Sequence, residues 1–249
     1  MRLRFAVILL IILFSSCSKR NNLPEKISNK IPLEELKFST DLKNSPIEES
    51  FSNMDFSALK SFVSQFESKD DNFNLLEFES KWNAFSNEND MLGWSDSELK
   101  IWAEITGLLL ELTNSSKYAE ELERIASVAG DDLQEIIAPY ILTKRIDHIY
   151  VNLFQPIEIN YSHTLGGEVK FWQETNYPKS GSVRLHFGMT ERRYIELFIR
   201  IPGWAKGSTV TVKKVKYFAA PGTYCKIAKK WNEGDVVEIK FPIEKYQIK

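Results

Sequence analysis

The chain has 249 residues, a formal net charge of −2 and a hydrophobic content of 43%. This length is enough for one or two domains with a buried core, and the composition is that of a globular protein. Positive and negative residues are nearly balanced, and the sequence shows no strongly basic patch. Such a patch is the usual electrostatic mark of nucleic-acid binding. We therefore expect no nucleic-acid partner.

The first residues have the features of a targeting segment. Two arginines among the first four residues precede the apolar run 5–14, which is too short to span a bilayer as a helix. The small Ser16 then precedes Cys17, an order that resembles a bacterial lipoprotein signal, in which the cysteine becomes the lipidated first residue. We expect residues 1–17 to be a lipoprotein signal peptide. The alternatives are a plain secretory signal cut near Ser16 and a buried helix.

Residues 18–54 are expected to form a flexible tether. They are rich in Lys, Asn, Ser and Pro and show little hydrophobic periodicity. An acyl chain on Cys17 would hold the protein on a membrane by burying methylene groups. The expected location is the cell envelope, lipid-anchored to a bacterial membrane on its periplasmic side or at the cell surface.

The cysteine count limits the chemistry that the chain can carry. There are two cysteines, and if Cys17 is lipidated then Cys225 has no disulfide partner. Cys225 lies in an alternating strand pattern, and no histidine or acid is near it in sequence. We interpret Cys225 as a small apolar core residue and not as a reactive thiol.

Apolar residues recur with two different periods along the chain. From 55 to 146 the spacing is helical, and Ser95 followed by Glu98 is a capping-box signature. From 147 to 249 apolar and polar residues alternate in about eight short strands separated by turn residues. The predicted fold class is α+β, with a short N-terminal helical region followed by an antiparallel β-sandwich.

Several motifs in the alternating half carry a resemblance to a known family. They are Gln173–Pro178, Arg200–Ala205 and Trp231–Asp235, with further similarity at Ile149–Phe154 and Tyr224–Pro242. In this order and spacing they resemble the β-sandwich that follows the catalytic barrel in glycoside hydrolase family 127, whose members act on β-L-arabinofuranosides.

The resemblance continues upstream with less specific motifs. Trp102 and the run 109–124 are similar to the last helices of that family's α/α barrel. The family would imply six helical hairpins, and the helical region is too short for twelve helices of ordinary length. We therefore expect residues 55–146 to be a remnant of the barrel and residues 147–249 to be the sandwich that resembles the family's middle domain.

The resemblance also implies a catalytic site that these residues do not reproduce. In the family a cysteine thiolate is the nucleophile, and zinc bound by cysteines and a glutamate lowers the pKa of that thiol. Residues 92–95 stand where a Glu-Thr-Cys motif normally lies, and the family's Cys-Cys pair is missing between Arg124 and His148. We expect no catalytic residue, no metal ligand and no cofactor, because the cysteines of the family's zinc site are missing from these positions.

A different glycosidase pair would need two acids facing each other across a cleft, one of them with a raised pKa. The candidates in the sandwich are Glu168, Glu174, Glu196 and Asp235. Glu196 alternates with core residues and should face solvent, and Asp235 follows Gly234 as a turn residue. Because charged residues are exposed by default, we do not expect a working pair.

Three tryptophans of the β half are candidates for contacting sugar rings, whose C–H faces suit a flat apolar side chain. They are Trp172, Trp204 and Trp231. The competing interpretation is core and interdomain packing, because tryptophan is usually largely buried. Phe171 and Trp172 cannot both face the core, since successive residues of a strand point to opposite faces.

Three functional hypotheses follow. The first is a non-catalytic envelope lipoprotein related to family 127, with an accessory or carbohydrate-binding role in glycan handling. Its expected partners are glycans and, through the anchor, a membrane. The second is an active glycoside hydrolase acting on arabinofuranosides or related glycans, and the third is a truncated remnant of a larger hydrolase.

Overall fold

The computed structural model describes residues 25–26, 55–128 and 134–243. The predicted signal peptide 1–17, with Cys17, lies outside these residues. So does the predicted tether 18–54, apart from Glu25–Lys26, which form the short strand β1. No helix within the described ranges is long and apolar enough to cross a membrane.

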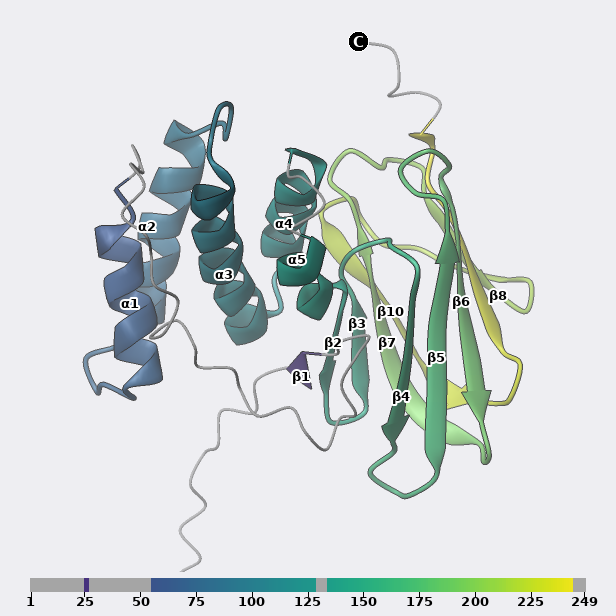
Figure 1. The fold of residues 1–249 in the computed structure, drawn as a ribbon. Coiled ribbons are helices and arrows are strands. Elements are labelled where there is room, and N and C mark those ends of the chain that lie inside the picture. Colours follow the sequence, from purple (N-terminus) through teal and green to yellow (C-terminus); the bar gives the residue numbers. More distant parts are fainter. Residues whose placement is uncertain (1–24, 27–54, 129–133, 244–249) are drawn as a thin grey trace, which may run out of the picture.

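Five helices form the N-terminal part of the described chain (Figure 1). They are α1 (Ser57–Glu67), α2 (Leu75–Glu88), α3 (Asp96–Thr113), α4 (Ser116–Val128) and α5 (Gln134–Ile141). The predicted capping box is confirmed at the start of α3. The Ser95 backbone N–H donates to the Glu98 carboxylate at 2.7 Å, and the Glu98 N–H donates to Ser95 Oγ at 3.4 Å. Asn114, with a left-handed φ of 51°, then ends α3.

Aromatic rings fill the interior of the helical part. Trp82 and Trp102 stack with their ring centroids 5.2 Å apart. The indole N–H of Trp82 donates to Thr106 Oγ1 at 3.0 Å, and that of Trp102 donates to Glu121 Oε1 at 2.6 Å. Each large ring therefore has a partner for its polar atom, which makes its burial favourable.

The remaining described residues form two sheets packed face to face. The first has the order β1-β2-β3-β7-β10, with β2 (Leu142–Arg145), β3 (His148–Val151), β7 (Arg193–Ile201) and β10 (Thr223–Trp231). The second has the order β4-β5-β6-β11-β8-β9, with β4 (Ile157–Ser162), β5 (Glu168–Thr175), β6 (Ser182–Met189), β8 (Thr209–Val212), β9 (Val215–Tyr217) and β11 (Val236–Lys240). Neighbouring strands are antiparallel except β3 and β7, which are parallel. The predicted α+β fold with a β-sandwich is confirmed.

The sandwich begins before the predicted boundary at residue 147. Strand β2 lies within the segment predicted to be helical, and it pairs with β3 from Leu142↔Val151 onward. Leu142, the first residue of β2, directly follows Ile141, the last residue of α5, and both are apolar. The hydrophobic period of the sequence therefore does not show where the helix ends and the strand begins. From β2 to β11 the described chain contains ten strands, against the expected eight or so.

Helix α4 joins the helical part to the sandwich. The Gly203 N–H donates to Glu120 Oε1 at 3.0 Å, and Ser116 Oγ donates to the carbonyl oxygen of Gly222. A Cβ at position 203 would lie 2.9 Å from that carboxylate, so glycine permits the close approach. The helices consequently lie beside the first sheet, and the outer face of the second sheet is turned away from them (Figure 1).

Candidate functional site

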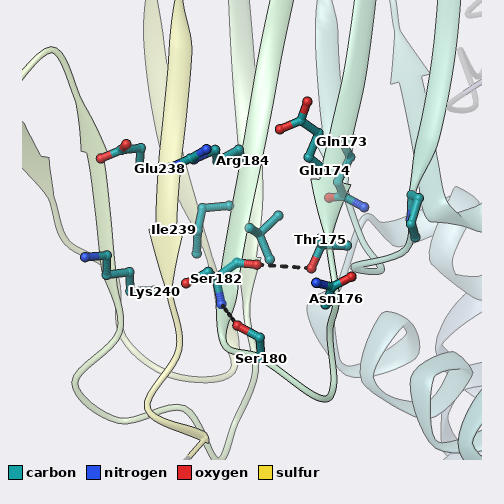
Figure 2. Close-up of a pocket in the computed structure, with 12 residues that line it drawn as sticks. Gln173, Glu174, Thr175, Asn176, Ser180, Ser182, Arg184, Glu238, Ile239 and Lys240 are labelled. Atoms are coloured by element: carbon teal, nitrogen blue, oxygen red, sulfur yellow. Dashed lines mark hydrogen bonds between the residues drawn. The ribbon is translucent and has the colours of Figure 1, made fainter.

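An open cavity lies on the second sheet, close to the hairpin turn that joins β5 to β6 (Figure 2). Its volume is about 550 Å³, which is within the range of small-molecule sites. Most of its lining is polar. The polar residues that matter below are Glu174, Asn176, Ser182, Arg184, Glu238 and Lys240.

A row of three charged side chains crosses this cavity. Glu174 of β5 is the register partner of Arg184 of β6, and Arg184 is also the partner of Glu238 of β11. Cross-strand partners point to the same face, and all three residues are exposed. Arg184 therefore lies between two glutamates, as Figure 2 shows. We name these three residues the Glu-Arg-Glu row.

The charges of this row are largely free to meet a ligand. Within the described ranges, the side chains of Arg184, Glu238 and Lys240 form no hydrogen bond or ion pair. Glu174 is different, because its Oε2 lies 3.1 Å from Nε2 of His186. That contact lacks hydrogen-bond geometry, since His186 Nε2 has no hydrogen-bond partner among the described residues.

Hydroxyl groups hold the hairpin turn beside the row in place. Thr175 Oγ1 donates to the Ser182 carbonyl at 3.2 Å and accepts the Tyr177 N–H at 3.0 Å. The Ser182 N–H in turn donates to Ser180 Oγ at 3.2 Å (Figure 2). These bonds fix the backbone at one end of the cavity. The side chain of Asn176 also lines the cavity at this end.

Trp172 lies one row beyond Glu174 on the same face of β5. Its ring is half-buried and stacks on the His186 ring, with centroids 4.8 Å apart and an interplanar angle of 5°. Lys170 Nζ lies 5.6 Å from the ring centroid. Phe171 is fully buried, which confirms that only one of these neighbours faces the core. A sugar contact by Trp172 remains a prediction. The position of Trp172 next to the Glu-Arg-Glu row favours it.

The other two tryptophans lie elsewhere. Trp231 is completely buried, its indole N–H donates to the Ile195 carbonyl at 3.0 Å, and its ring stacks on Phe187 at 4.1 Å. Trp231 is therefore inaccessible to a sugar in this structure, which fits the competing interpretation of core packing. The signal was in the sequence, because Trp231 has the same strand phase as the core residue Cys225. Trp204 is half-buried and packs against the core, and a sugar contact there remains a prediction.

The candidate carboxylates do not converge on one cleft. Glu174 and Glu196 project from opposite outer faces of the sandwich, from β5 and β7. Glu168 and Glu174 share a face, but six residues of extended strand separate them by about 20 Å, well beyond the spacing of a glycosidase pair.

The environments of two of these acids also oppose a general-acid role. A hydrogen bond from Lys226, at 2.7 Å, is the main cause that lowers the pKa of Glu196. Burial acts to raise the pKa of Asp235, but its bonds to Lys213, the Asn232 N–H and Lys229 outweigh burial and lower that pKa. Asp235 belongs to the turn that the sequence indicated, where it accepts the Asn232 N–H at 3.2 Å, but it is buried and not exposed as acids usually are.

Glu121 of α4 is an acid that sequence reasoning missed. Burial raises its pKa, although the hydrogen bond from Trp102 and the charge of Arg124 oppose that shift. Its neighbours are the packed aromatic rings of the helical part, so its setting is that of a buried structural acid.

The described residues do not fit the zinc centre that the resemblance implies. Cys225 is buried in β10, and burial raises the pKa of its thiol to about 11, the opposite of what an activated nucleophile requires. No group of three His, Cys, Asp or Glu side chains in the described ranges is placed to hold a metal ion.

Comparison with known families identifies the class of the β part. Residues 148–243 match a family model described as "Beta-L-arabinofuranosidase, GH127 middle domain". No curated protein matches the chain. The sandwich is thus related to the middle domain of GH127 glycoside hydrolases, and the predicted resemblance is confirmed over this segment.

Solved structures with a similar fold include larger glycoside hydrolases. One, described as a glycoside hydrolase, is 24% identical with a TM-score of 0.50 over 59% of this chain and 32% of its own. A GH127 β-L-arabinofuranosidase from Geobacillus stearothermophilus T6 is 26% identical, with a TM-score of 0.48 over 58% and 30%. The GH127 β-arabinofuranosidase BT3674 is 20% identical, with a TM-score of 0.47 over 57% and 32%. This chain spans about a third of the length of these proteins.

Proposed function

We propose that this protein is an envelope-anchored lipoprotein that binds glycans through its sandwich and does not hydrolyse them. The relation of residues 148–243 to the GH127 middle domain supports a role in glycan handling. The observation that carries the binding proposal is the Glu-Arg-Glu row, an exposed set of charged side chains in a cavity of about 550 Å³.

The chemistry of this row suits a polyhydroxylated ligand. A sugar hydroxyl both donates and accepts hydrogen bonds, so it pairs with carboxylate acceptors and with the five N–H donors of a guanidinium. Hydrogen bonds in which one partner is charged are stronger than neutral ones. Because Arg184 and Glu238 have no partners among the described residues, a sugar would add such bonds without breaking existing ones.

The arrangement of the candidate nucleophile and acids supports the absence of hydrolysis. Glycoside hydrolysis needs either two converging carboxyl groups or, in the resembled family, an activated thiolate. Glu174 and Glu196 face opposite directions, and Glu168 lies about 20 Å from Glu174. Glu174 and Glu238 share a face, but Arg184 lies between them. Cys225 is a buried thiol with a raised pKa. We propose that the helical part, 55–141, is the remnant of a barrel that now serves to support the sandwich.

Two measurements on the purified protein test binding and hydrolysis together. Titration calorimetry against a panel of plant and host oligosaccharides should give binding, and complete absence of binding would remove the proposal. Incubation with arabinofuranosides and added zinc should release no sugar. Turnover that persists in Cys225→Ala would overturn the non-catalytic assignment.

The anchor is tested in a bacterial host that processes lipoproteins. The full chain should fractionate with membranes, and Cys17→Ala should move it to the soluble fraction. Cys225→Ala is the matched control and should leave the protein on the membrane. Membrane association of Cys17→Ala equal to that of the unmodified chain would contradict lipidation at this residue.

A further inference from the structure

We propose that the Glu-Arg-Glu row selects neutral glycans and holds them across the strands, with Arg184 at the centre of the contact. This inference rests on the proposed glycan-binding function and specifies where on the protein, and for which class of sugar, binding occurs.

The first argument is the order of charges along the row. Neighbouring strands lie about 4.8 Å apart, so the sheet places an acceptor, a donor and a second acceptor at that repeat. Glu174, Arg184 and Glu238 supply these groups from β5, β6 and β11. A ligand that meets all three must itself alternate between donating and accepting, which successive hydroxyl groups of a sugar can do.

The second argument concerns the charge of the ligand. A negatively charged group that bonded to Arg184 would also lie beside the carboxylates of Glu174 and Glu238, which repel it. A positively charged group that bonded to either carboxylate would lie beside the Arg184 guanidinium. With Lys240 included, the four side chains carry two negative and two positive charges, so their net field is small. A neutral ligand avoids both repulsions and still receives charge-assisted hydrogen bonds.

The third argument gives the direction of the bound chain. On one side of the row, two residues along each strand, stand the stacked rings of Trp172 and His186. On the other side lie Ser182 and its register partner Lys240, followed by the hairpin turn with Asn176. The polar band between these two boundaries runs across β5, β6 and β11, so we expect the sugar chain to cross the strands.

Calorimetry with paired ligands tests this inference. The probes are arabino-, xylo- and gluco-oligosaccharides as neutral glycans and oligogalacturonates as acidic ones. We expect binding of at least one neutral probe and at least tenfold weaker binding of oligogalacturonate. Arg184→Ala and Glu238→Gln should each weaken neutral binding about tenfold, as expected for lost hydrogen bonds to charged groups. Arg192→Ala, an exposed arginine outside the row, should bind like the unmodified protein.

The outcomes separate this inference from the function on which it rests. Glycan binding that Arg184→Ala and Glu238→Gln leave unchanged would overturn the location while the glycan-binding function stood. Tighter binding of oligogalacturonate than of every neutral probe would overturn the neutral selectivity. No binding to any probe would overturn the proposed function itself. Because the substituted side chains are exposed, unchanged melting temperatures would show that each variant is folded.

Discussion

The guanidinium of Arg200, at the end of β7, donates through Nη2 to the carboxylate of Glu123 in α4 at 2.5 Å. Arg200 is completely buried, and its Nε donates to the Asn152 carbonyl at 2.5 Å. A charged residue of a sandwich motif thus reaches into the helical part and joins the two halves of the described structure.

Removing Glu123 should destabilise the whole described fold. Glu123→Ala leaves the Arg200 guanidinium buried without its counter-charge, and breaking a buried ion pair in this way costs about 3–5 kcal/mol. Urea unfolding measures this loss. Glu120→Ala, which removes only the acceptor of the exposed Gly203 N–H, is the matched control and should cost about 1 kcal/mol. Equal effects of the two substitutions would mean that the Arg200 pair does not hold the halves together.

Asp235 should make stability depend on acid pH. Burial favours its neutral form, but the bonds from Lys213, the Asn232 N–H and Lys229 outweigh burial and hold its pKa below the usual 3.8. The stabilisation is therefore present above pH 4 and lost as the pH falls through the lower folded pKa. We expect Asp235→Asn to cost about 2 kcal/mol at pH 7. The difference in melting temperature between the two proteins should shrink toward pH 3, and a constant difference would refute this assignment.

Cys225 should be unreactive in the native protein. Burial raises the pKa of its thiol from 9.0 to about 11, so the thiolate is scarce at pH 8. Ellman's reagent should label Cys225 slowly in the native Cys17→Ala protein and rapidly in guanidinium. Because the folded pKa is the higher one, the stability linked to this group is complete below pH 9 and declines as the pH rises through about 11. Rapid native labelling at pH 8 would contradict the burial of the thiol.

Trp172 should report glycan binding by fluorescence. Its ring is half-buried and stands one row from Glu174, whereas Trp231 is completely buried in the core. A sugar bound on the Glu-Arg-Glu row should therefore change the fluorescence emission of Trp172 and leave that of Trp231 unchanged. Trp172→Phe should abolish the change on titration with a ligand that calorimetry has identified. Trp94→Phe, which alters a partly buried tryptophan of the helical part, should retain it. A signal that survives Trp172→Phe would place the ligand elsewhere.

Local patterns of the sequence determined much of this protein. The change of period separated helices from strands, the Ser95–Glu98 spacing gave a helix start, and the ordered strand motifs indicated the GH127 middle domain. The alternation around Cys225 placed this cysteine in the core, and the same phase applies to Trp231. These features follow from residues close in sequence, because capping and side-chain alternation act over a few positions.

Only the tertiary structure decided which strands are neighbours. Strand β11 inserts between β6 and β8, and that pairing places Glu238 beside Arg184. The same kind of long-range pairing assigns β2 to the sandwich, and packing of α4 on β7 brings Glu123 to the buried Arg200. Such contacts depend on backbone hydrogen bonds and burial between segments distant in sequence. An alternating pattern specifies which face of a strand is buried, but it does not specify which strand will be its partner.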